Sequence, residues 1–484
     1  MMESLIPQKK NNLLSSYYSD ILKRRSGDEI MVLANIKRFV DCCAGSGLLR
    51  KSLKENDLEV AQFVCRSHRI DLEVETLLPI WHDLFDVENR KSDRNDNKYQ
   101  KMWCEWVSDT EKFREKYKEA GGECQNTKFR KWRGRQIERC KTELGDTKRI
   151  THSVAAIELS SGCSVGCWFC ALDAKKFEGY FAYTPENSSM WAECLSVLTE
   201  ELGPALQTAF CYWATEPSDN PDYVKYIKDF YDVVGLFAQT TTSQPLKNIE
   251  WTKEVLKLYN NENAMPCRFS LLNYNELLKV HEIFSPVDLL TVELIQQFKG
   301  SMTKKSRAGR LLMNGTRSGY QTLGSDDVGS TIACVSGYLV NMPERRVCLV
   351  TPCMADRQMP LGYKIIDECF FKDAGELRDF IRGSIDTYMQ EYLSSDDYVR
   401  LRQDIEIRII PDGIELVVTP SNVRIKCSER YGSMLKILSQ DGVSVRVFMD
   451  KMLEAGKDYF EIMNDLQQFY DMGFLEDLSA VKVN

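Results

Sequence analysis

The chain has 484 residues, 43% of them hydrophobic, and is therefore long enough for two to four globular domains with large cores. Its 63 basic and 71 acidic side chains give a formal net charge of -8, a balance that does not favour binding to a phosphate backbone, so no nucleic acid is expected as a partner. Residues 1–12 do not resemble a secretory signal, and no apolar run reaches membrane-spanning length. We therefore expect a cytoplasmic protein with no membrane partner.

An N-terminal helical region is predicted over residues 1–150. Apolar residues recur at helical spacing between residues 29 and 53, and a second apolar stretch follows over residues 60–84. Residues 86–149 then carry dense mixed charge, with aromatic residues on one face of a predicted long helix: Trp103, Trp106, Phe113 and Tyr117. Interleaved aromatic and basic residues are also typical of RNA-binding segments, but acidic residues are equally frequent here, which favours a solvated amphipathic helix.

Residues 151–395 have a different pattern, in which short apolar runs are each followed by a loop and a helix-like segment. The predicted strands are residues 154–159, 208–214, 233–240, 268–272 and 289–294. Strands that alternate with helices predict parallel β/α units that close into a full or partial barrel. In such folds the active site lies at the carboxyl ends of the strands.

The last section, residues 396–484, is predicted to be a small winged-helix-like domain. Ile405, Ile407 and Ile409 alternate with charged residues, a turn follows over residues 411–413, and two further strands are predicted at residues 414–418 and 423–427. Three helices follow these strands in the predicted order. The whole chain is thus predicted to be an α/β protein with helical and winged-helix-like additions.

Three cysteines stand close together directly after the first predicted strand. Cys163, Cys167 and Cys170 fall within eight residues, and Gly162 and Gly166 allow the loop between them to curl. Thiolates are the ligands that iron–sulfur clusters require, and three of them leave one iron of a four-iron cluster open. The sequence therefore predicts a metal site on this loop.

A zinc site is the alternative for the same cysteines. Zinc in a structural site needs a fourth ligand at finger spacing, yet the nearest histidine, His152, precedes the strand, and no second cysteine pair is present. Most of the other cysteines among the 17 in the chain are expected to be small buried apolar residues.

The C-x3-C-x2-C spacing after the first strand resembles the signature of the radical S-adenosylmethionine (AdoMet, or SAM) superfamily. This resemblance implies a partial (β/α)6 barrel and one [4Fe-4S] cluster held by Cys163, Cys167 and Cys170, with S-adenosyl-L-methionine chelating the open iron. It also implies a reducing partner such as flavodoxin or ferredoxin. Beyond Cys170 no further cysteines stand at close spacing, so no second cluster is expected.

Candidate AdoMet contacts follow from the same resemblance. Thr215-Glu216-Pro217, at the end of the second predicted strand, resembles the glycine-glutamate-proline segment that meets the AdoMet amino group, although Ala214 and Thr215 replace the glycines. Hydroxyl and basic residues at the third and fourth strands are further candidates for contacts with AdoMet: Thr241, Thr242, Ser243, Arg268 and Ser270. Capping of the strand ends is the alternative explanation of each.

The chain further resembles the proteusin-type radical SAM peptide epimerases, which are isomerases that modify ribosomally synthesised peptides (RiPPs). The resemblance is carried by residues 212–217, 219–223, 331–353 and 360–363. It implies conversion of L- to D-amino acid residues in a precursor peptide: a 5'-deoxyadenosyl radical removes the α-hydrogen, and a cysteine thiol returns a hydrogen atom to the opposite face.

The C-terminal module resembles the RiPP recognition element (RRE) of peptide-tailoring enzymes. This resemblance implies that the leader of the precursor adds a strand to the predicted strand at residues 423–427 and rests against the last helix, while the core peptide enters the barrel.

Cys353 is the first candidate for the thiol that donates the hydrogen atom, Cys334 the second and Cys369 the third. If residues 341–344 form a tight turn, the strands on either side pair antiparallel, with Cys334 opposite Thr351 and on the same face as Cys353. A lone cysteine in an apolar strand is otherwise more often a core residue.

Two other functions remain possible on this sequence. One is a radical SAM maturase that forms thioether or carbon–carbon crosslinks in a peptide. The other is a non-catalytic iron–sulfur regulator that binds DNA through its winged-helix-like domain. Acidic residues along the last predicted helix argue against the regulator: Asp458, Glu461, Asp465 and Asp471.

Overall fold

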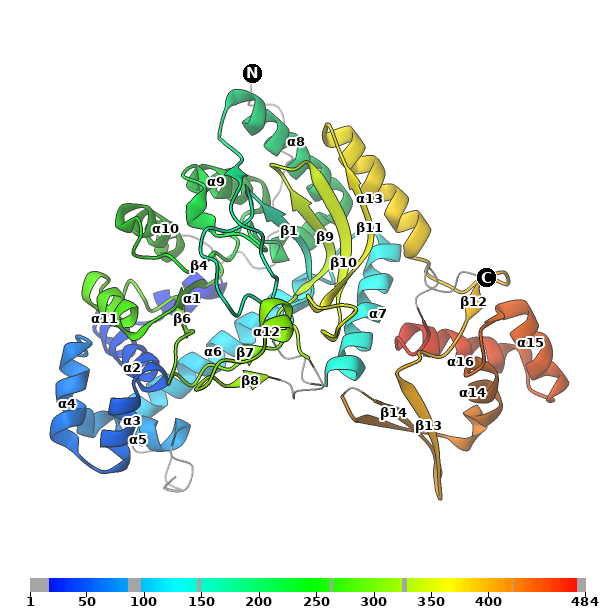
Figure 1. The fold of residues 1–484 in the computed structure, drawn as a ribbon, viewed down its shortest axis with the longest axis horizontal. Helices are drawn as coiled ribbons and strands as arrows, with labels where there is room; N and C mark the ends of the chain where they lie inside the picture. Colours follow the sequence, from blue (N-terminus) through cyan, green and yellow to red (C-terminus); the bar gives the residue numbers. More distant parts are fainter. Residues whose placement is uncertain are drawn as a thin grey trace.

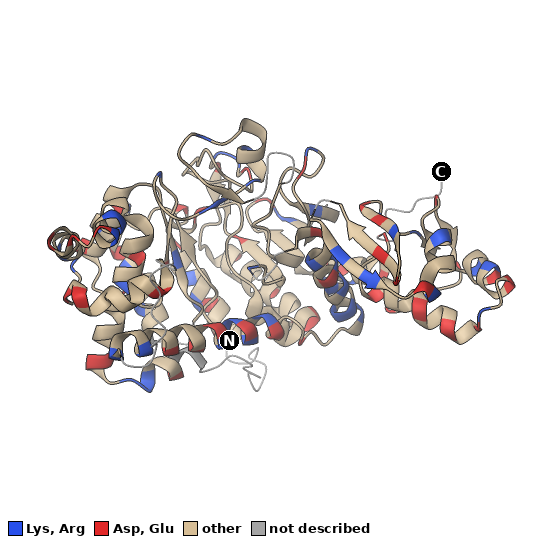
Figure 2. Cartoon of the chain, turned by 90° about the horizontal axis from the view of Figure 1, so that it is seen from below, with Lys and Arg blue, Asp and Glu red and all other residues tan. Residues whose placement is uncertain are grey.

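The computed structural model describes residues 17–85, 97–145, 149–261, 264–323, 329–419 and 421–476. They form a mixed α/β structure in which a helical part, a central α/β part and a small C-terminal unit follow one another along the longest axis (Figure 1). Residues 1–12, which were not expected to form a secretory signal, lie outside this description. Acidic and basic side chains are interspersed along the whole length of the molecule (Figure 2). In the described part, no helix is both long enough and apolar enough to span a bilayer.

Helices make up the part that precedes the first strand, as predicted. They are α1 (Tyr17–Lys23), α2 (Gly27–Gly45), α3 (Gly47–Lys54), α4 (Leu58–Ser67), α5 (Val74–Leu84), α6 (Lys98–Ala120) and α7 (Thr127–Leu144). The predicted long amphipathic helix is α6, on which Trp106, Phe113 and Tyr117 are buried. The last helix, α7, packs against β9 and β10 of the central sheet and also against α16 of the C-terminal unit.

The central part is built on parallel strand pairing, as predicted. β1 (Ser153–Glu158) is buried along most of its length and pairs in parallel with β9 (Val335–Asn341). On its other side β1 makes a single parallel bridge, from Ala156 to Phe210. A second parallel sheet has the order β4-β5-β6, and its strands are β4 (Thr241–Thr242), β5 (Cys267–Leu271) and β6 (Val292–Gln296).

Helices fill the connections between these strands and form an outer layer around them (Figure 1). They are α8 (Pro185–Leu202), the 3-10 helix η2 (Gly203–Thr208), α9 (Tyr223–Val234), α10 (Ile249–Asn261) and α11 (Tyr274–Ile283). The predicted alternation of strands and helices is confirmed. The predicted strands at residues 208–214 and 233–240 are present only as bridges, at Phe210 and from Phe237 to Ala264. Because the described strands pair in separate sheets, the (β/α)6 barrel stays a prediction.

The first sheet continues with two antiparallel strands, in the order β1-β9-β10-β11. These strands are β10 (Arg346–Pro352) and β11 (Tyr363–Phe370), and α13 (Ala374–Tyr388) follows them and packs against α8. The predicted antiparallel pairing of β9 with β10 is confirmed, but its predicted register is wrong. Gly337 lies opposite Val350 and Asn341 opposite Arg346, whereas the predicted register would place Gly337 opposite Cys348 and Asn341 opposite Glu344.

The register differs because the connection is a four-residue loop rather than a tight two-residue turn. The loop contains Pro343, and Arg345 adopts a positive φ of 53° before the chain enters β10. The pairing is thereby displaced by two residues. Since side chains alternate between faces with a period of two, this displacement alone moves no residue to the other face. However, β9 has one extra residue relative to β1 between Val335 and Tyr338, which reverses the alternation before Tyr338. The prediction that Cys334 and Cys353 share a face is therefore wrong, since Cys334 lies near Arg268 and Cys353 near Glu143 of α7.

A segment between β6 and β9 lies in front of the central strands (Figure 1). Its elements are β7 (Lys305–Ser306), α12 (Gly309–Asn314) and β8 (Thr322–Leu323), with β7 and β8 paired in parallel. This segment was not predicted, because its elements are too short to show a periodic apolar pattern.

The C-terminal unit has the predicted order of three strands and three helices. The strands form an antiparallel sheet, β13 (Ile405–Ile410), β14 (Gly413–Val418) and β15 (Val423–Cys427). The helices are α14 (Gly432–Leu438), α15 (Val445–Glu454) and α16 (Tyr459–Asp471). Two short strands, β12 (Tyr398–Val399) and β16 (Val443–Ser444), pair beside them, and the 3-10 helix η4 (Glu429–Tyr431) precedes α14. The unit has its own apolar core, which includes Leu416, Leu438 and Leu466.

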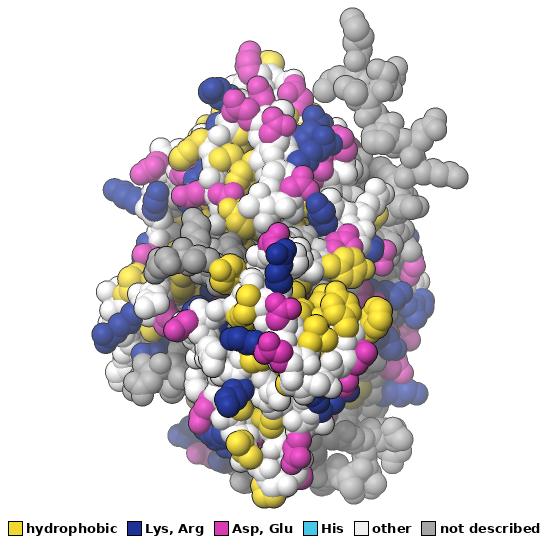
Figure 3. Space-filling model, turned by 90° about the vertical axis from the view of Figure 1, so that its right-hand side faces the viewer, with side chains coloured by type: hydrophobic (Ala, Val, Ile, Leu, Met, Phe, Trp, Pro, Cys, Tyr) yellow, Lys and Arg dark blue, Asp and Glu magenta, His cyan; other side chains and the backbone are white. Residues whose placement is uncertain are grey.

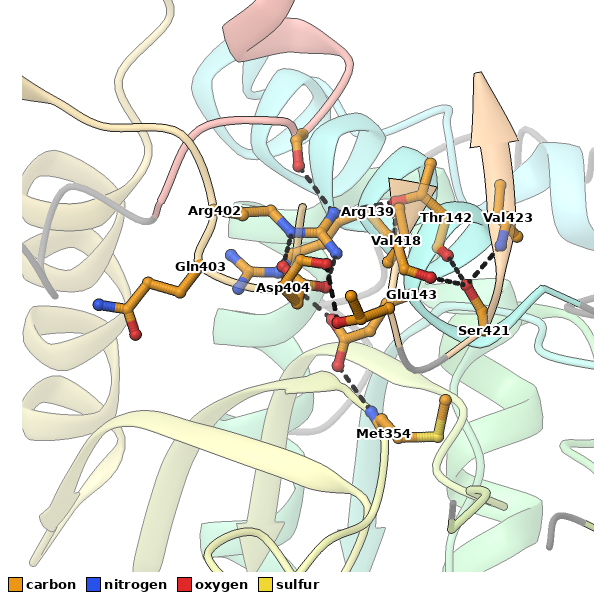
Figure 4. A network of polar contacts seen from close by, with 12 residues as sticks. Arg139, Thr142, Glu143, Met354, Arg402, Gln403, Asp404, Val418, Ser421 and Val423 are labelled. Carbon is orange, nitrogen blue, oxygen red and sulfur yellow. Dashed lines mark hydrogen bonds and ion pairs between the residues drawn. The ribbon is translucent and has the colours of Figure 1, made fainter. Parts of the chain in front are cut away.

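Polar contacts join the C-terminal unit to α7 (Figure 4). Arg402, whose side chain is fully buried, pairs with Asp404 at 2.5 Å and donates to the hydroxyl of Thr142 (2.9 Å) and to the Gly473 carbonyl (3.0 Å). The Ser421 hydroxyl donates to the Thr142 carbonyl at 2.6 Å. The C-terminal unit is therefore held against α7 by two partly buried hydrogen bonds to Thr142 as well as by packing.

Candidate functional site

The loop that follows β1 is closed at its base by a short antiparallel pair. The paired strands are β2 (Ser160–Ser161) and β3 (Gly179–Tyr180). The backbone N–H of Cys163 donates to the Lys175 carbonyl at 2.9 Å. Gly162 has a φ of 74°, and a side chain there would collide with the Lys176 carbonyl, so only glycine fits. Gly166 also has a positive φ, of 64°, and the predicted role of both glycines in curling the loop is confirmed.

Cys163, Cys167 and Cys170 are all partly exposed on this loop. Burial raises the pKa of Cys163 to about 11 and the pKa of Cys167 to about 12, and each is raised further by the neighbouring Cys170 thiol. In the described residues, no three His, Cys, Asp or Glu side chains are gathered tightly enough to hold a single metal ion. A cluster makes a different demand, because each cysteine binds a different iron and the sulfurs stay apart. Three thiols on one curled loop fit that demand.

Two side chains from outside the loop fix its backbone. Arg310 of α12 donates through Nη1 to the Cys167 carbonyl (3.0 Å) and through Nε to Asp173 (2.8 Å). The carboxylate of Asp219, in the 3-10 helix η3 (Pro217–Asp219), accepts from the backbone N–H (2.8 Å) and the hydroxyl (2.6 Å) of Ser164. The loop is therefore held in place by the protein alone.

Glu216 lies beside this loop, 2% exposed, at the end of the second predicted strand. One carboxylate oxygen accepts from the Thr242 hydroxyl (2.5 Å) and from the Ser218 hydroxyl (2.9 Å), while the other accepts from the Ser243 N–H (2.8 Å). Burial raises the pKa of Glu216, and these hydrogen bonds oppose the rise. Of the predicted AdoMet contacts, the structure thus brings Glu216, Thr242 and Ser243 together, with Thr215 partly exposed next to them.

Glu158 is a further candidate, which sequence reasoning missed. It ends β1 and accepts from the Ala214 N–H (2.8 Å) and from the Asn341 amide (2.9 Å). Burial raises the pKa of the Glu158 carboxyl to about 7, so it takes up or releases a proton near neutral pH. The available signal was a carboxylate placed directly at the carboxyl end of a buried strand, five residues before Cys163.

Polar side chains from the parallel strands share one face, opposite the helices. In β5 the residues Cys267, Phe269 and Leu271 are buried against the helical layer, so the partly exposed Arg268 and Ser270 point the other way. Others on this face are Tyr212, Thr241 and Glu293. The Thr241 hydroxyl donates to the Tyr212 hydroxyl at 2.8 Å, and Arg268, 37% exposed, pairs with Glu293 at 2.7 Å. The predicted contacts Thr241, Arg268 and Ser270 therefore line one face together.

Cys334 belongs to the same surroundings. It directly precedes β9, and its carbonyl accepts from the Ser153 N–H (2.7 Å) at the start of β1. Its thiol is partly exposed; burial raises its pKa, while the charge of Arg268 and a hydrogen bond with Thr151 lower it. Because β1 and β9 run parallel, Cys334 lies at the amino end of β1, whereas the Cys163 loop follows its carboxyl end.

Cys353 and Cys369 lie elsewhere. Cys353 is 2% exposed, its N–H donates to the Gly362 carbonyl (3.0 Å), and burial together with the Glu143 carboxylate raises its pKa to about 12. Glu143 belongs to α7, which covers this side of the sheet. The Glu143 carboxylate accepts a hydrogen bond from the Met354 N–H at 2.7 Å (Figure 4). Cys369 is partly exposed on β11, at the edge of the sheet. The structure does not bring these two thiols to the face that carries Arg268 and Cys334.

The chain is similar to known proteins in sequence and in structure. No family model matches the chain. The chain is 38% identical over 400 residues to the uncharacterized protein y4wI of Sinorhizobium fredii (strain NBRC 101917 / NGR234), an alignment that covers 81% of this chain and 77% of that one. The chain therefore belongs to the same protein family as y4wI. Among solved structures it is similar to BtrN in complex with AdoMet and 2-DOIA, with 14% identity, a TM-score of 0.30, and coverage of 48% of this chain and 81% of BtrN.

Proposed function

We propose that this protein is a radical AdoMet enzyme that converts L- to D-amino acid residues in a ribosomally synthesised precursor peptide. In this proposal Cys163, Cys167 and Cys170 hold one [4Fe-4S] cluster. When bound, the cluster and AdoMet supply a 5'-deoxyadenosyl radical, which takes the α-hydrogen of a substrate residue. The support is the set of three thiols on a curled loop at the carboxyl end of β1, next to the buried Glu216.

Glu216 is proposed to shape the AdoMet site. Its two carboxylate oxygens already accept hydrogen bonds from Thr242, Ser218 and Ser243, so the end of the third predicted strand is fixed to the end of the second. Oε1 also accepts from the Ser218 N–H, whereas Oε2 accepts from the Ser243 N–H alone, so the second acceptor position of Oε2 is proposed to bind the amino group of AdoMet. Thr215, Thr241, Arg268 and Ser270 stay proposed contacts of AdoMet or of the substrate.

The observation that carries the proposal of epimerisation is the position of Cys334. Inversion needs the hydrogen to leave one face of the α-carbon and a second hydrogen to arrive at the other face. The Cys163 loop and Glu216 lie at the carboxyl ends of the strands, and Cys334 lies at the amino end of β1, with Tyr212 and Thr241 on the face between. A substrate residue bound on that face has the radical on one side and the thiol on the other. Cys334 is therefore proposed as donor ahead of Cys353.

The hydrogen balance of this step is simple. The α-carbon radical takes a hydrogen atom from the Cys334 S–H, so a C–H bond forms, the S–H bond breaks, and a thiyl radical remains. One electron from the reductant, proposed to be a flavodoxin or ferredoxin, and one proton from solvent restore the thiol. Because a thiol proton exchanges with water, the returned hydrogen derives from the solvent.

The C-terminal unit is proposed to bind the leader of the precursor. β15 is an edge of its sheet, and a leader in extended conformation can add a strand there. Arg430, which follows β15, pairs with Glu461 and Asp465 of α16. This helix begins with Tyr459 and Phe460, which are 51% and 78% exposed. Apolar side chains stand among charged ones on this side of the molecule (Figure 3). An extended peptide at β15 thus has both a strand edge and exposed aromatic rings in reach.

Hydrogen exchange tests the leader site, because the same sheet supplies a control. The proposal predicts that a synthetic leader slows amide exchange in residues 423–427 of β15 but not in residues 405–410 of β13, the opposite edge. Equal protection of both edges, or of neither, contradicts strand addition at β15.

Reaction in heavy water tests the function itself. The anaerobically reconstituted protein is incubated with AdoMet, a reductant and a candidate precursor peptide. We expect 5'-deoxyadenosine and one deuterium for each inverted centre, with D-residues found after hydrolysis. A loss of two hydrogens from the peptide would identify a crosslinking enzyme instead, and a protein that forms no 5'-deoxyadenosine is not a radical AdoMet enzyme.

A further inference from the structure

Lys305 of β7 is a buried cation beside the cysteine loop. It is 3% exposed, and its ammonium group lies 4.2 Å from the ring centroid of Phe169 and 4.8 Å from that of Tyr320. The same group donates to the carbonyl (2.8 Å) and to the side-chain oxygen (3.0 Å) of Gln297. None of the carboxylates in the described residues forms an ion pair with it. Within the part of the chain that the structure describes, its ammonium group therefore contacts only neutral groups.

Such an arrangement is costly unless a negative charge lies near. Removing an ammonium ion from water costs several kcal/mol, whereas a cation–π contact returns only about 1–2 kcal/mol. Desolvation lowers the pKa of Lys305 to about 8, and the one side chain that opposes the fall is Cys167. Cys167, one of the three cysteines proposed to hold the cluster, is thus close enough to Lys305 for its charge to affect the pKa of the ammonium group.

The position of Lys305 relative to Cys167 is fixed by several contacts. Phe169, one wall of its cage, lies between Cys167 and Cys170 in the loop. Tyr320, the other wall, packs edge-on against Trp168 with ring centroids 5.0 Å apart. The guanidinium of Arg317 lies 4.6 Å from the centroid of the same Trp168 ring. The segment that contains β7 and β8 therefore closes over the loop and keeps the ammonium group from turning to solvent.

Arg310 does not have the same role, although it touches the same loop. Its guanidinium is bound to Asp173 and to two backbone carbonyls, those of Cys167 and Ala174. Its charge is thus already balanced by a carboxylate. Arg317 also contacts the loop, through Trp168, but it is exposed to solvent. Among the described cations of this segment that contact the loop, Lys305 is thus the one that is buried and has no carboxylate partner.

We propose that Lys305 is a fixed counter-charge for the iron–sulfur cluster, which makes it a positioning residue that raises the reduction potential of the cluster. This inference rests on the proposed function, because it assumes the cluster on Cys163, Cys167 and Cys170. The physical reason is that reduction adds one negative charge to the cluster. A buried positive charge at fixed distance stabilises the reduced state more than the oxidised state.

Potentiometric titration followed by electron paramagnetic resonance tests the inference, without AdoMet or peptide. The variants are Lys305→Met, which removes the charge, and Lys305→Arg, which keeps it. Lys304→Met removes a charge from the exposed neighbour on the same segment and is the matched control. We expect Lys305→Met to weaken reduction about tenfold, a shift of about 59 mV to lower potential for a one-electron couple. Lys305→Arg is expected to shift far less, and Lys304→Met not at all.

The outcomes separate the two proposals. A wild-type protein that binds no iron overturns the proposed function. A wild-type cluster with the same potential in Lys305→Met overturns only the role of Lys305. If Lys305→Met retains no cluster, Lys305→Gln is tested as a second neutral variant. Loss of the cluster in both neutral variants, with retention in Lys305→Arg, supports the role of Lys305 as a counter-charge. Loss of the cluster in all three variants shows that the loop needs the packing of the Lys305 side chain and not its charge, and this result overturns the inference.

Discussion

Nδ1 of His68 lies 2.9 Å from Nδ1 of His281, and both side chains are fully buried. The two histidines join α4 to α11, so they connect the helical part to the central part. Nε2 of His68 lies 2.8 Å from the Tyr274 hydroxyl. Two facing Nδ1 atoms form a hydrogen bond only when one carries a proton and the other does not, so the pair is neutral on at least one ring.

Stability is predicted to fall as the pH drops below neutrality. Burial and the nearby Arg38 lower the pKa of His68 from 6.5 to about 4, and burial lowers the pKa of His281 well below 6.5. The folded protein keeps both rings neutral while the unfolded chain binds protons, so stability is complete above pH 6.5 and is lost between about 6.5 and 4. Each histidine contributes a slope of about 1.4 kcal/mol per pH unit.

Urea unfolding at several pH values checks this prediction. The free energy of unfolding is expected to decline as the pH falls below 6.5. The buried His152, whose pKa is also lowered, adds to this decline, and Glu158, whose raised pKa acts in the opposite direction, reduces it. In His281→Gln the decline should be less steep by about 1.4 kcal/mol per pH unit, because one titrating group is absent. A flat profile between pH 6.5 and 5 would contradict the assignment.

The two candidate donor cysteines are predicted to respond differently to replacement. Cys334→Ala should still form 5'-deoxyadenosine but should yield neither D-residues nor deuterium uptake, because no hydrogen atom is returned. Cys353→Ala should retain inversion and lose about 1 kcal/mol of stability, since it removes a buried sulfur packed against α7. Mass spectrometry of the peptide and urea unfolding measure the two effects. Cys369→Ala is the control, and inversion by Cys334→Ala would remove Cys334 as donor.

Local patterns in the sequence were sufficient to predict several parts of the fold. The alternation of apolar residues predicted β13, β14 and β15 to within one residue, and the spacing of Cys163, Cys167 and Cys170 predicted the loop after β1. These signals are local, because strand period and ligand spacing both act over fewer than ten residues.

Other parts depend on contacts between distant residues and could not be predicted. Cys353 is the first candidate donor on the sequence because it ends an apolar strand. In the structure α7, more than 200 residues earlier in the chain, covers it, and Glu143 of α7 accepts a hydrogen bond from the N–H of the next residue, Met354. Lys305 has no distinctive sequence pattern, and its burial depends on Phe169 and Tyr320. The register of β9 and β10 depended on the conformation of a single loop.

Replacing the Glu216 carboxylate is predicted to affect both AdoMet binding and stability. In Glu216→Gln one acceptor oxygen becomes an NH2 group, which faces donors such as the Ser243 N–H and the Thr242 hydroxyl. An unsatisfied buried donor costs about 1–3 kcal/mol, and the Kd for AdoMet should rise at least tenfold. Thr242→Val, which removes a single donor, should cost less. Calorimetric titration with AdoMet and urea unfolding check both; unchanged binding in Glu216→Gln would exclude Glu216 from the AdoMet site.

The attachment of the C-terminal unit is predicted to depend on Arg402. Arg402→Met leaves the carboxylate of Asp404 and the Gly473 carbonyl without their buried partner, and breaking such a pair costs about 3 kcal/mol. Lys426→Met is the control, because the pair of Lys426 with Asp412 is 71% and 70% exposed and contributes about 0–1 kcal/mol. We expect Arg402→Met to unfold at lower urea concentration and to become sensitive to proteolysis between α13 and β13, since the unit then separates from α7 more often. A loss of stability no larger than that of Lys426→Met would mean that apolar packing alone holds the unit in place.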